Sequence, residues 1–310
     1  MTGLSHNAQW VLASALMLGA AAGTVGCFAY WKRQSLMGDA LAHAALPGVV
    51  VGYALLGFKS LPVMLAGAAA SALLGALAVA AIRAHSRIKE DTAMGIILSV
   101  FIGLGIMLLA IVNRMPGGGK SGLDSFIFGQ AAAMVRQDML VMTAAAVVVL
   151  LVVLISFKEW KLYLFDPAFA RGLGLSGRLM EAAWMTLLVA VIVIGIQAVG
   201  VILMAALLII PPVSARSWTN AFGRMLALSA LFGGGAGAVG TWISTLGDGW
   251  PTGPFIVIAA AGMFLVSLLF GVRKGLLVTA MLRRRQMRRL RTERAGDVRR
   301  DAFAEGEALP

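Results

Sequence analysis

The chain contains 310 residues, of which 60% are hydrophobic and 13% are charged. Soluble globular domains carry about 25% charged residues, so this composition excludes an ordinary soluble domain and indicates a polytopic membrane protein. The net charge of +12 would also suit a nucleic-acid-binding protein, but the positions of the basic residues argue against nucleic acid as a partner, as shown below.

The N-terminal segment, residues 1–9, lacks the basic region of a signal peptide, and the apolar run Trp10–Trp31 that follows is long enough to cross a membrane. We therefore expect Trp10–Trp31 to stay in the mature protein as its first span. Cys27, the sole cysteine, lies in the middle of this run. It has no partner for an intrachain disulfide, and we expect it to be a small buried hydrophobic residue.

Six further apolar runs reach or approach the ~20 residues that a spanning helix needs. These runs are Leu36–Leu56, Leu61–Ile82, Ala93–Val112, Met139–Phe157, Met225–Leu246 and Phe255–Val272. The run Ala182–Val213 is different, since a single helix of that length would measure about 48 Å in a hydrocarbon core of about 30 Å. We divide it near Gly200 into two short helices of about 24 Å in a tight hairpin inside the bundle. The prediction is an all-α membrane protein with about nine transmembrane helices.

The segment Gly38–Gly48 carries Asp39 and His43 inside an apolar run. Of 14 carboxylates and three histidines, these two are the only ones that fall within a predicted span. Residues four apart share one face of a helix, so the two side chains form a potential metal chelate. Ionisable groups in a membrane usually mark an ion path or a proton relay. We expect Pro47 and Gly48 to interrupt this helix and release backbone carbonyls beside the pair.

The alternative for Asp39 is a shallow position in which it only caps the helix that begins there. Lys32 and Arg33 put the membrane interface near Trp31, which allows this reading. It leaves His43, one turn deeper, unexplained.

Small residues recur at a spacing of four, as in Gly19/Gly23, Gly67/Ser71/Gly75 and Gly233/Gly237, which favours close helix packing. The run Gly117–Ser121 superficially resembles a phosphate-binding loop. A Walker A motif needs Gly where this chain has Arg114, and no strand precedes the run. We interpret it as an external loop, so the chain carries no ATPase motif of its own and is not expected to be an enzyme.

Nine spans with the N-terminus outside place 22 of the 26 Lys and Arg residues on the cytoplasmic side, as the positive-inside rule requires. Only Lys59, Arg114, Lys120 and Arg136 remain outside. Eight spans would leave the arginine-rich tail outside. We therefore divide the chain into a transmembrane domain, residues 1–275, and a basic cytoplasmic tail, residues 276–310, which we expect to touch anionic lipid or a cytoplasmic partner.

The longest predicted cytoplasmic loop, Lys158–Met180, contains signals for a short helix. Asp166 suits the N-cap with Pro167 at the first helical position, and Gly172 or Gly174 suits the end. Such a helix on a cytoplasmic loop is a docking surface. The alternative is a simple connector.

The sequence resembles the membrane permease subunits of the manganese/zinc/iron family of ATP-binding-cassette (ABC) importers. The matching stretches are Gly38–Gly48, Glu90–Gly95, Phe165–Ser176, Gly200–Pro211 and Pro251–Pro254. The resemblance implies an ABC importer permease bundle in the bacterial cytoplasmic (inner) membrane. It also implies a second permease copy or a sister permease, ATPase subunits that bind ATP in the cytoplasm, and an extracytoplasmic metal-binding protein, with no permanently bound cofactor.

By the same resemblance, Asp39 and His43 are the intramembrane metal ligands, and the ATPase coupling motif Glu-Ala-Ala-x-x-x-Gly falls on Asp166, Pro167, Ala168 and Gly172. Asp in place of Glu and Pro in place of the first Ala are departures from that motif.

The sequence therefore predicts that this protein takes part in the ATP-driven import of a divalent transition metal. Two copies of the Asp39/His43 pair would supply two oxygens and two nitrogens, and the lack of thiolates favours manganese over zinc, with iron also suited. An ion-coupled secondary transporter is the alternative, but we find no internal repeat of the kind such carriers show. An intramembrane metalloenzyme is disfavoured because no further histidine or carboxylate lies within a predicted span to supply the third ligand or the base.

Overall fold

The computed structural model describes residues 6–58, 60–114, 136–247, 250–273, 275–277 and 279. Within these ranges the regular structure is entirely α-helical. The helices are α1 (His6–Trp31), α2 (Ser35–Leu56), α3 (Leu61–His85), α4 (Glu90–Arg114), α6 (Arg136–Ile155), α7 (Phe157–Phe165), α8 (Pro167–Gly172), α9 (Gly177–Val199), α10 (Val201–Arg216), α11 (Phe222–Ser244) and α12 (Thr252–Phe270). The loop Gly117–Ser121 and nearly all of the predicted tail lie outside the described residues.

Eight of these helices are long and apolar enough to cross a membrane: α1, α2, α3, α4, α6, α9, α11 and α12. The ninth predicted segment, α10, is also an apolar helix, but its 16 residues measure only about 24 Å. The predicted all-α membrane fold is therefore confirmed.

The long apolar run divides at Gly200, as predicted, with φ of 93°, a left-handed value that glycine adopts without strain. Met204 of α10 returns against Gly195 of α9, so the chain reverses locally. The predicted length of about 24 Å is wrong for α9. This helix begins at Gly177, and its 23 residues measure about 34 Å, which is enough to cross the hydrocarbon core. The described side chains of α10 are all buried or half-buried, which places this short helix inside the bundle.

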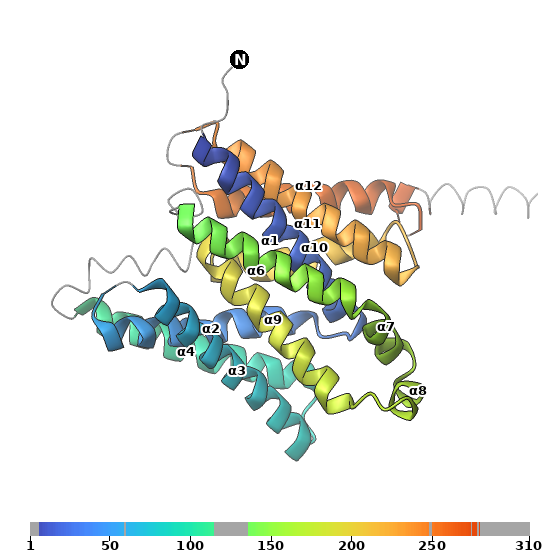
Figure 1. Ribbon diagram of the computed structural model, residues 1–310, viewed down its shortest axis with the longest axis horizontal. Helices are drawn as coiled ribbons and strands as arrows, with labels where there is room; N and C mark the ends of the chain where they lie inside the picture. The colour runs from blue at the N-terminus through green and yellow to red at the C-terminus, as the bar shows by residue number, and fades with distance from the viewer. Residues whose placement is uncertain are drawn as a thin grey trace, which may run out of the picture.

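The helices form two groups joined by α9 and α10 (Figure 1). One group packs α2 against both α3 and α4. The other packs α1 against α6, α10 and α11, and α11 against α12. Helix α9 crosses between the groups and contacts members of each, while α10 packs against both α1 and α2. Helices α7 and α8 lie together at one end of α6 and α9 (Figure 1).

Close glycine packing joins α1 to α11, as the spacing of small residues predicts. A Cβ at Gly19 would overlap the backbone carbonyl of Gly233, and the reverse also holds. One turn away, the hydroxyl of Ser229 donates to the carbonyl of Gly23 at 2.6 Å. The two backbones approach this closely only because neither glycine carries a side chain.

We expect Gly233→Val to lower the stability of the protein by about 1–3 kcal/mol or more, because the added side chain must push α1 and α11 apart. Thermal unfolding of the purified protein in detergent measures the loss. Gly103→Val is the matched control, since a Cβ there meets no atom within 4 Å. Equal melting temperatures for the two variants would contradict the close packing of α1 on α11.

Candidate metal centre

Asp39 and His43 lie on α2, one helical turn apart. Their closest atoms are Asp39 Oδ1 and His43 Nε2, at 3.5 Å. Helix α2 begins at Ser35 after the cap residue Gln34, so Asp39 is already inside the helix. The alternative that Asp39 serves as the helix cap is therefore wrong, and both side chains are free to face one ligand.

The predicted interruption at Pro47 and Gly48 does not occur. Helix α2 continues through both residues to Leu56. Proline has no backbone N–H, so the carbonyl of His43 still loses its normal partner four residues later. The adjacent carbonyl of Ala44 accepts a bond from the Ser71 hydroxyl of α3 at 2.6 Å. One carbonyl is thus released beside the pair within an unbroken helix.

Neighbouring helices fix the orientation of α2 around the pair. Leu208 of α10 lies against Gly38, with its Cδ1 2.9 Å from the position of a Cβ there. On the other side, Gly48 and Gly67 of α3 approach so closely that a Cβ at either would overlap the backbone of the other. The reversal at Gly200 is what brings α10 against this part of α2.

The first turns of α2 are incompletely covered by the rest of the chain, and the pair lies on them. Leu36 is 45% exposed, and the side chains of Asp39 and His43 are 30% and 17% exposed. Residues 44–50, which follow the pair, are all buried. A carboxylate facing lipid would be costly, so the uncovered part of α2 requires a polar path or another protein chain against it.

Within the described part of the chain, no group of three or more His, Cys, Asp or Glu side chains could hold a metal ion. The Asp39/His43 pair therefore offers at most two side-chain ligands. Transition metals in proteins generally take four or more ligands, so an ion bound there would need further ligands from outside this chain or from water and backbone carbonyls.

A second carboxylate, Glu181, lies within a membrane-spanning helix. The prediction that Asp39 is the sole carboxylate within a span is therefore wrong. Because α9 starts at Gly177, Glu181 is its fifth residue, the same register that Asp39 has in α2. Glu181 is neutralised by Lys32, with Nζ to Oε2 at 2.5 Å. Burial lowers the pKa of Lys32 below its usual range, and Glu181 opposes that effect. An ion pair therefore accounts for Glu181, whereas among the described residues Asp39 forms a salt-bridge contact with only His43.

A second polar group lies beside that ion pair. Glu90 at the start of α4 accepts from Arg83 at 2.7 Å and from Gln34 at 2.5 Å. These contacts tie the α1–α2 turn to the ends of α3 and α4. Lys32 and Glu181 are 149 residues apart in sequence, so no local pattern could have predicted this cluster.

The predicted docking element forms as expected in its local structure. Asp166 caps α8 by accepting from the N–H of Phe169 at 2.9 Å, Pro167 is the first helical residue, and the helix ends at Gly172. Ala168 and Gly172 are exposed. Helix α7, which precedes it, was not predicted.

Aromatic side chains hold this loop against the bundle. Phe165 lies edge-on to Trp31 at a centroid distance of 5.0 Å and to Phe222 at 5.8 Å. Trp160 of α7, 4% exposed, packs edge-on against Phe28 at 5.5 Å. The loop is therefore joined to α1 and α11 by packed rings.

Comparison with known proteins identifies the family. Residues 5–271 match the family model of the ABC 3 transport family. The chain belongs to this family. It is 46% identical to the manganese transport system membrane protein MntC of Bacillus subtilis over 290 residues, covering 92% of this chain and 67% of that protein. It is 44% identical to the zinc transport system membrane protein TroC of Treponema pallidum, covering 90% and 94%.

A solved structure supports the same assignment. The chain superposes on PsaBC from Streptococcus pneumoniae in complex with Fab with a TM-score of 0.75 and 34% identity, covering 87% of this chain and 93% of that chain. The resemblance to metal ABC importer permeases and the permease bundle fold, both predicted from the sequence, are confirmed. This member of the ABC 3 transport family is an integral membrane permease subunit.

Proposed function

We propose that this permease imports manganese, and that each ion passes an intramembrane site built from Asp39 and His43 of two permease copies. The observation that carries the proposal is the pair itself, with Asp39 Oδ1 and His43 Nε2 3.5 Å apart and both side chains only partly covered. The named relatives transport manganese and zinc. Their identities with this chain are nearly equal, so the choice of metal depends on the chemistry of the ligands.

Two observations lead us to propose a second permease copy: the pair supplies only two ligands, and its side chains are not fully covered. Two ligands on an incompletely covered face become four when a second α2 lies against the first. That arrangement also removes Asp39 from lipid, which is the energetic reason for it. A sister permease with the same ligands would serve equally.

The ligand chemistry favours manganese over zinc. Carboxylate, imidazole and the released His43 carbonyl form a mixed oxygen and nitrogen set, and thiolates, which would favour zinc, are absent from the pair. A transport site must also release its ion, which disfavours the tightest binder. Ferrous iron fits the same set.

The partners of the proposal are cytoplasmic ATPase subunits docked at α8 and an extracytoplasmic metal-binding protein. The docking surface comprises the exposed residues Phe165, Ala168, Phe169, Gly172 and Leu173.

Transport assays test the proposal, with the permease, the ATPase subunit and the binding protein reconstituted together in liposomes. We expect ATP-dependent uptake of manganese that excess zinc reduces only at higher concentration. Uptake that is driven by a proton gradient without ATP would contradict it, as would zinc uptake that excess manganese does not reduce.

The proposed orientation has the N-terminus outside and α8 in the cytoplasm. We expect single cysteines at Ser86 and Ser176, in a background without Cys27, to react from the cytoplasmic side, and a cysteine at Ser60 to react from the other. Ser86 and Ser176 are exposed, so a reagent reaches both. Labelling with a membrane-impermeant maleimide in intact cells and in inverted vesicles measures this. Reaction of Ser60 and Ser176 from the same side would show that the orientation is wrong.

A further inference from the structure

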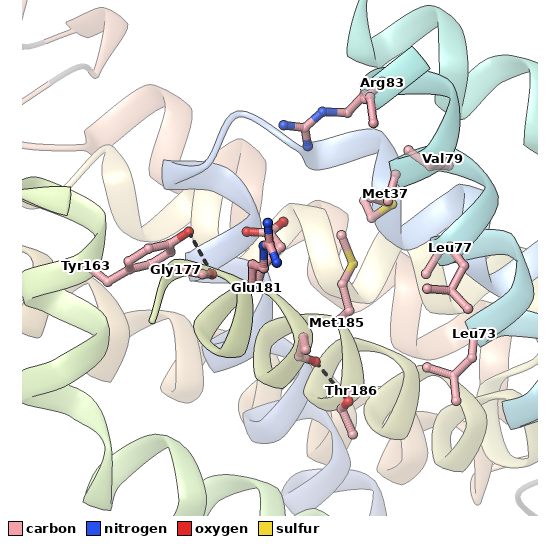
Figure 2. A pocket seen from close by; sticks show the side chains of 15 residues that line it. Met37, Leu73, Leu77, Val79, Arg83, Tyr163, Gly177, Glu181, Met185 and Thr186 are labelled. Carbon is pink, nitrogen blue, oxygen red and sulfur yellow. Dashed lines mark hydrogen bonds between the residues drawn. The ribbon is translucent and has the colours of Figure 1, made fainter. Parts of the chain in front are cut away.

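A cavity of about 830 Å³ lies mainly between α3 and α9, with Met37 of α2 also in its wall, and neither Asp39 nor His43 lines it. Figure 2 shows Leu73, Leu77 and Arg83 along one wall on α3, with Met185 and Thr186 facing them from α9. The volume lies within the range of about 300–1,000 Å³ that is usual for small-molecule sites.

The cavity is apolar along most of its length and charged at one end. Its walls along α3 and α9 are formed by residues such as Leu73, Leu77 and Met185, while Arg83, Arg178 and Glu181 lie at the helix ends. The apolar wall belongs to predicted spans, so the charged end lies at the membrane interface. Leu77 is 66% exposed, so the rest of the chain leaves apolar surface uncovered here.

The charged end has an excess of one positive charge. Arg83 is paired with Glu90, and Lys32 is paired with Glu181. Arg178 is exposed and makes no ion pair with any described residue. Arg83 is also available in part, since a guanidinium has five N–H donors and its side chain is 44% exposed. Two arginines can therefore hold a phosphate between them.

We propose that this cavity binds an anionic phospholipid, with its phosphate between Arg178 and Arg83 and an acyl chain along Leu77 and Met185. Basic pockets between transmembrane helices at the cytoplasmic side are suited to anionic headgroups. The apolar wall distinguishes this ligand from a free phosphate, because a soluble anion would leave that wall uncovered. This inference requires only that the chain is membrane-embedded, and it is independent of the transported metal.

The first test measures lipid binding to the detergent-purified, delipidated permease by native mass spectrometry. Phosphatidylglycerol and phosphatidylcholine with identical acyl chains are compared. We expect tighter binding of phosphatidylglycerol, and Arg178→Gln should reduce its affinity about fivefold, the effect of one basic residue near a membrane surface. Arg224→Gln is the matched control, an exposed arginine at the start of α11 that does not line the cavity, and it should retain the preference.

The second test fills the cavity. Ala80→Trp projects into it, whereas the neighbouring Ala81, also exposed, does not line it. We expect Ala80→Trp to abolish tight phosphatidylglycerol binding and Ala81→Trp to leave it unchanged. The proposal is overturned if Arg178→Gln keeps the lipid preference, or if glycerol phosphate alone binds as tightly as the lipid. It is also overturned if Ala80→Trp disrupts permease dimers while lipid still binds, because a second copy would then occupy the cavity.

Discussion

Asp39→Ala and His43→Ala should each reduce metal uptake at least ~100-fold while the permease still inserts into the membrane. Loss of an outer partner of a metal ligand commonly costs 10–100-fold, and loss of a ligand should cost at least as much. Insertion should not suffer, because each change removes a polar group from a span. Uptake of manganese in the reconstituted system measures the first effect, and the amount of folded protein in detergent measures the second.

The matched controls are Asp91→Ala and His85→Ala, which remove an exposed carboxylate and an exposed imidazole near the ends of α4 and α3. Both should transport at the normal rate. Normal uptake in Asp39→Ala or His43→Ala would place the ion path elsewhere. The two-copy arrangement has its own readout: Asp39→Cys in a chain with Cys27→Ser should form disulfide-linked dimers under mild oxidation. If these dimers do not form, the pair does not face its counterpart.

Gly172→Arg should abolish the docking of the ATPase subunit and lower uptake at least ~10-fold without changing the melting temperature of the permease. A Cβ at Gly172 meets no atom within 4 Å, so the substitution fits the fold. The new charged side chain would nevertheless occupy the surface beside Phe169 and Leu173, which are 57% and 62% exposed. Co-purification of the ATPase subunit and metal-stimulated ATP hydrolysis measure the effect.

Gly172→Ala is the control for this substitution, because it adds only the Cβ that the open space accepts, and it should assemble and transport normally. If the Gly172→Arg permease binds its ATPase and transports at the normal rate, α8 is a connector and the docking surface lies elsewhere. An Arg variant that lowers the melting temperature would also contradict the expectation that the site is open.

Features that depend on neighbouring residues in the sequence were predicted correctly. The apolar runs are helices because twenty apolar residues in a membrane must satisfy their backbone hydrogen bonds internally. The cap of α8 by Asp166 and the break at Gly200 follow from the local preferences of Asp, Pro and Gly. The spacing of Asp39 and His43 already places them on one face of α2. For these features, the interactions extend over only a few residues.

Other features were decided by contacts between distant segments. Local rules predict a break at Pro47, but α2 continues because Ser71 and Gly67 of α3 pack against the turn that contains the proline. Glu181 was predicted to lie just outside the apolar run Ala182–Val213, and only its ion pair with Lys32, 149 residues away, shows how its charge is balanced inside α9. The sequence alone determined which apolar segments are helices and which residues share a helical face, because those depend on local backbone geometry. Only the tertiary structure decided which faces are covered and which charges are paired, because burial and ion pairing depend on helices that are distant in sequence.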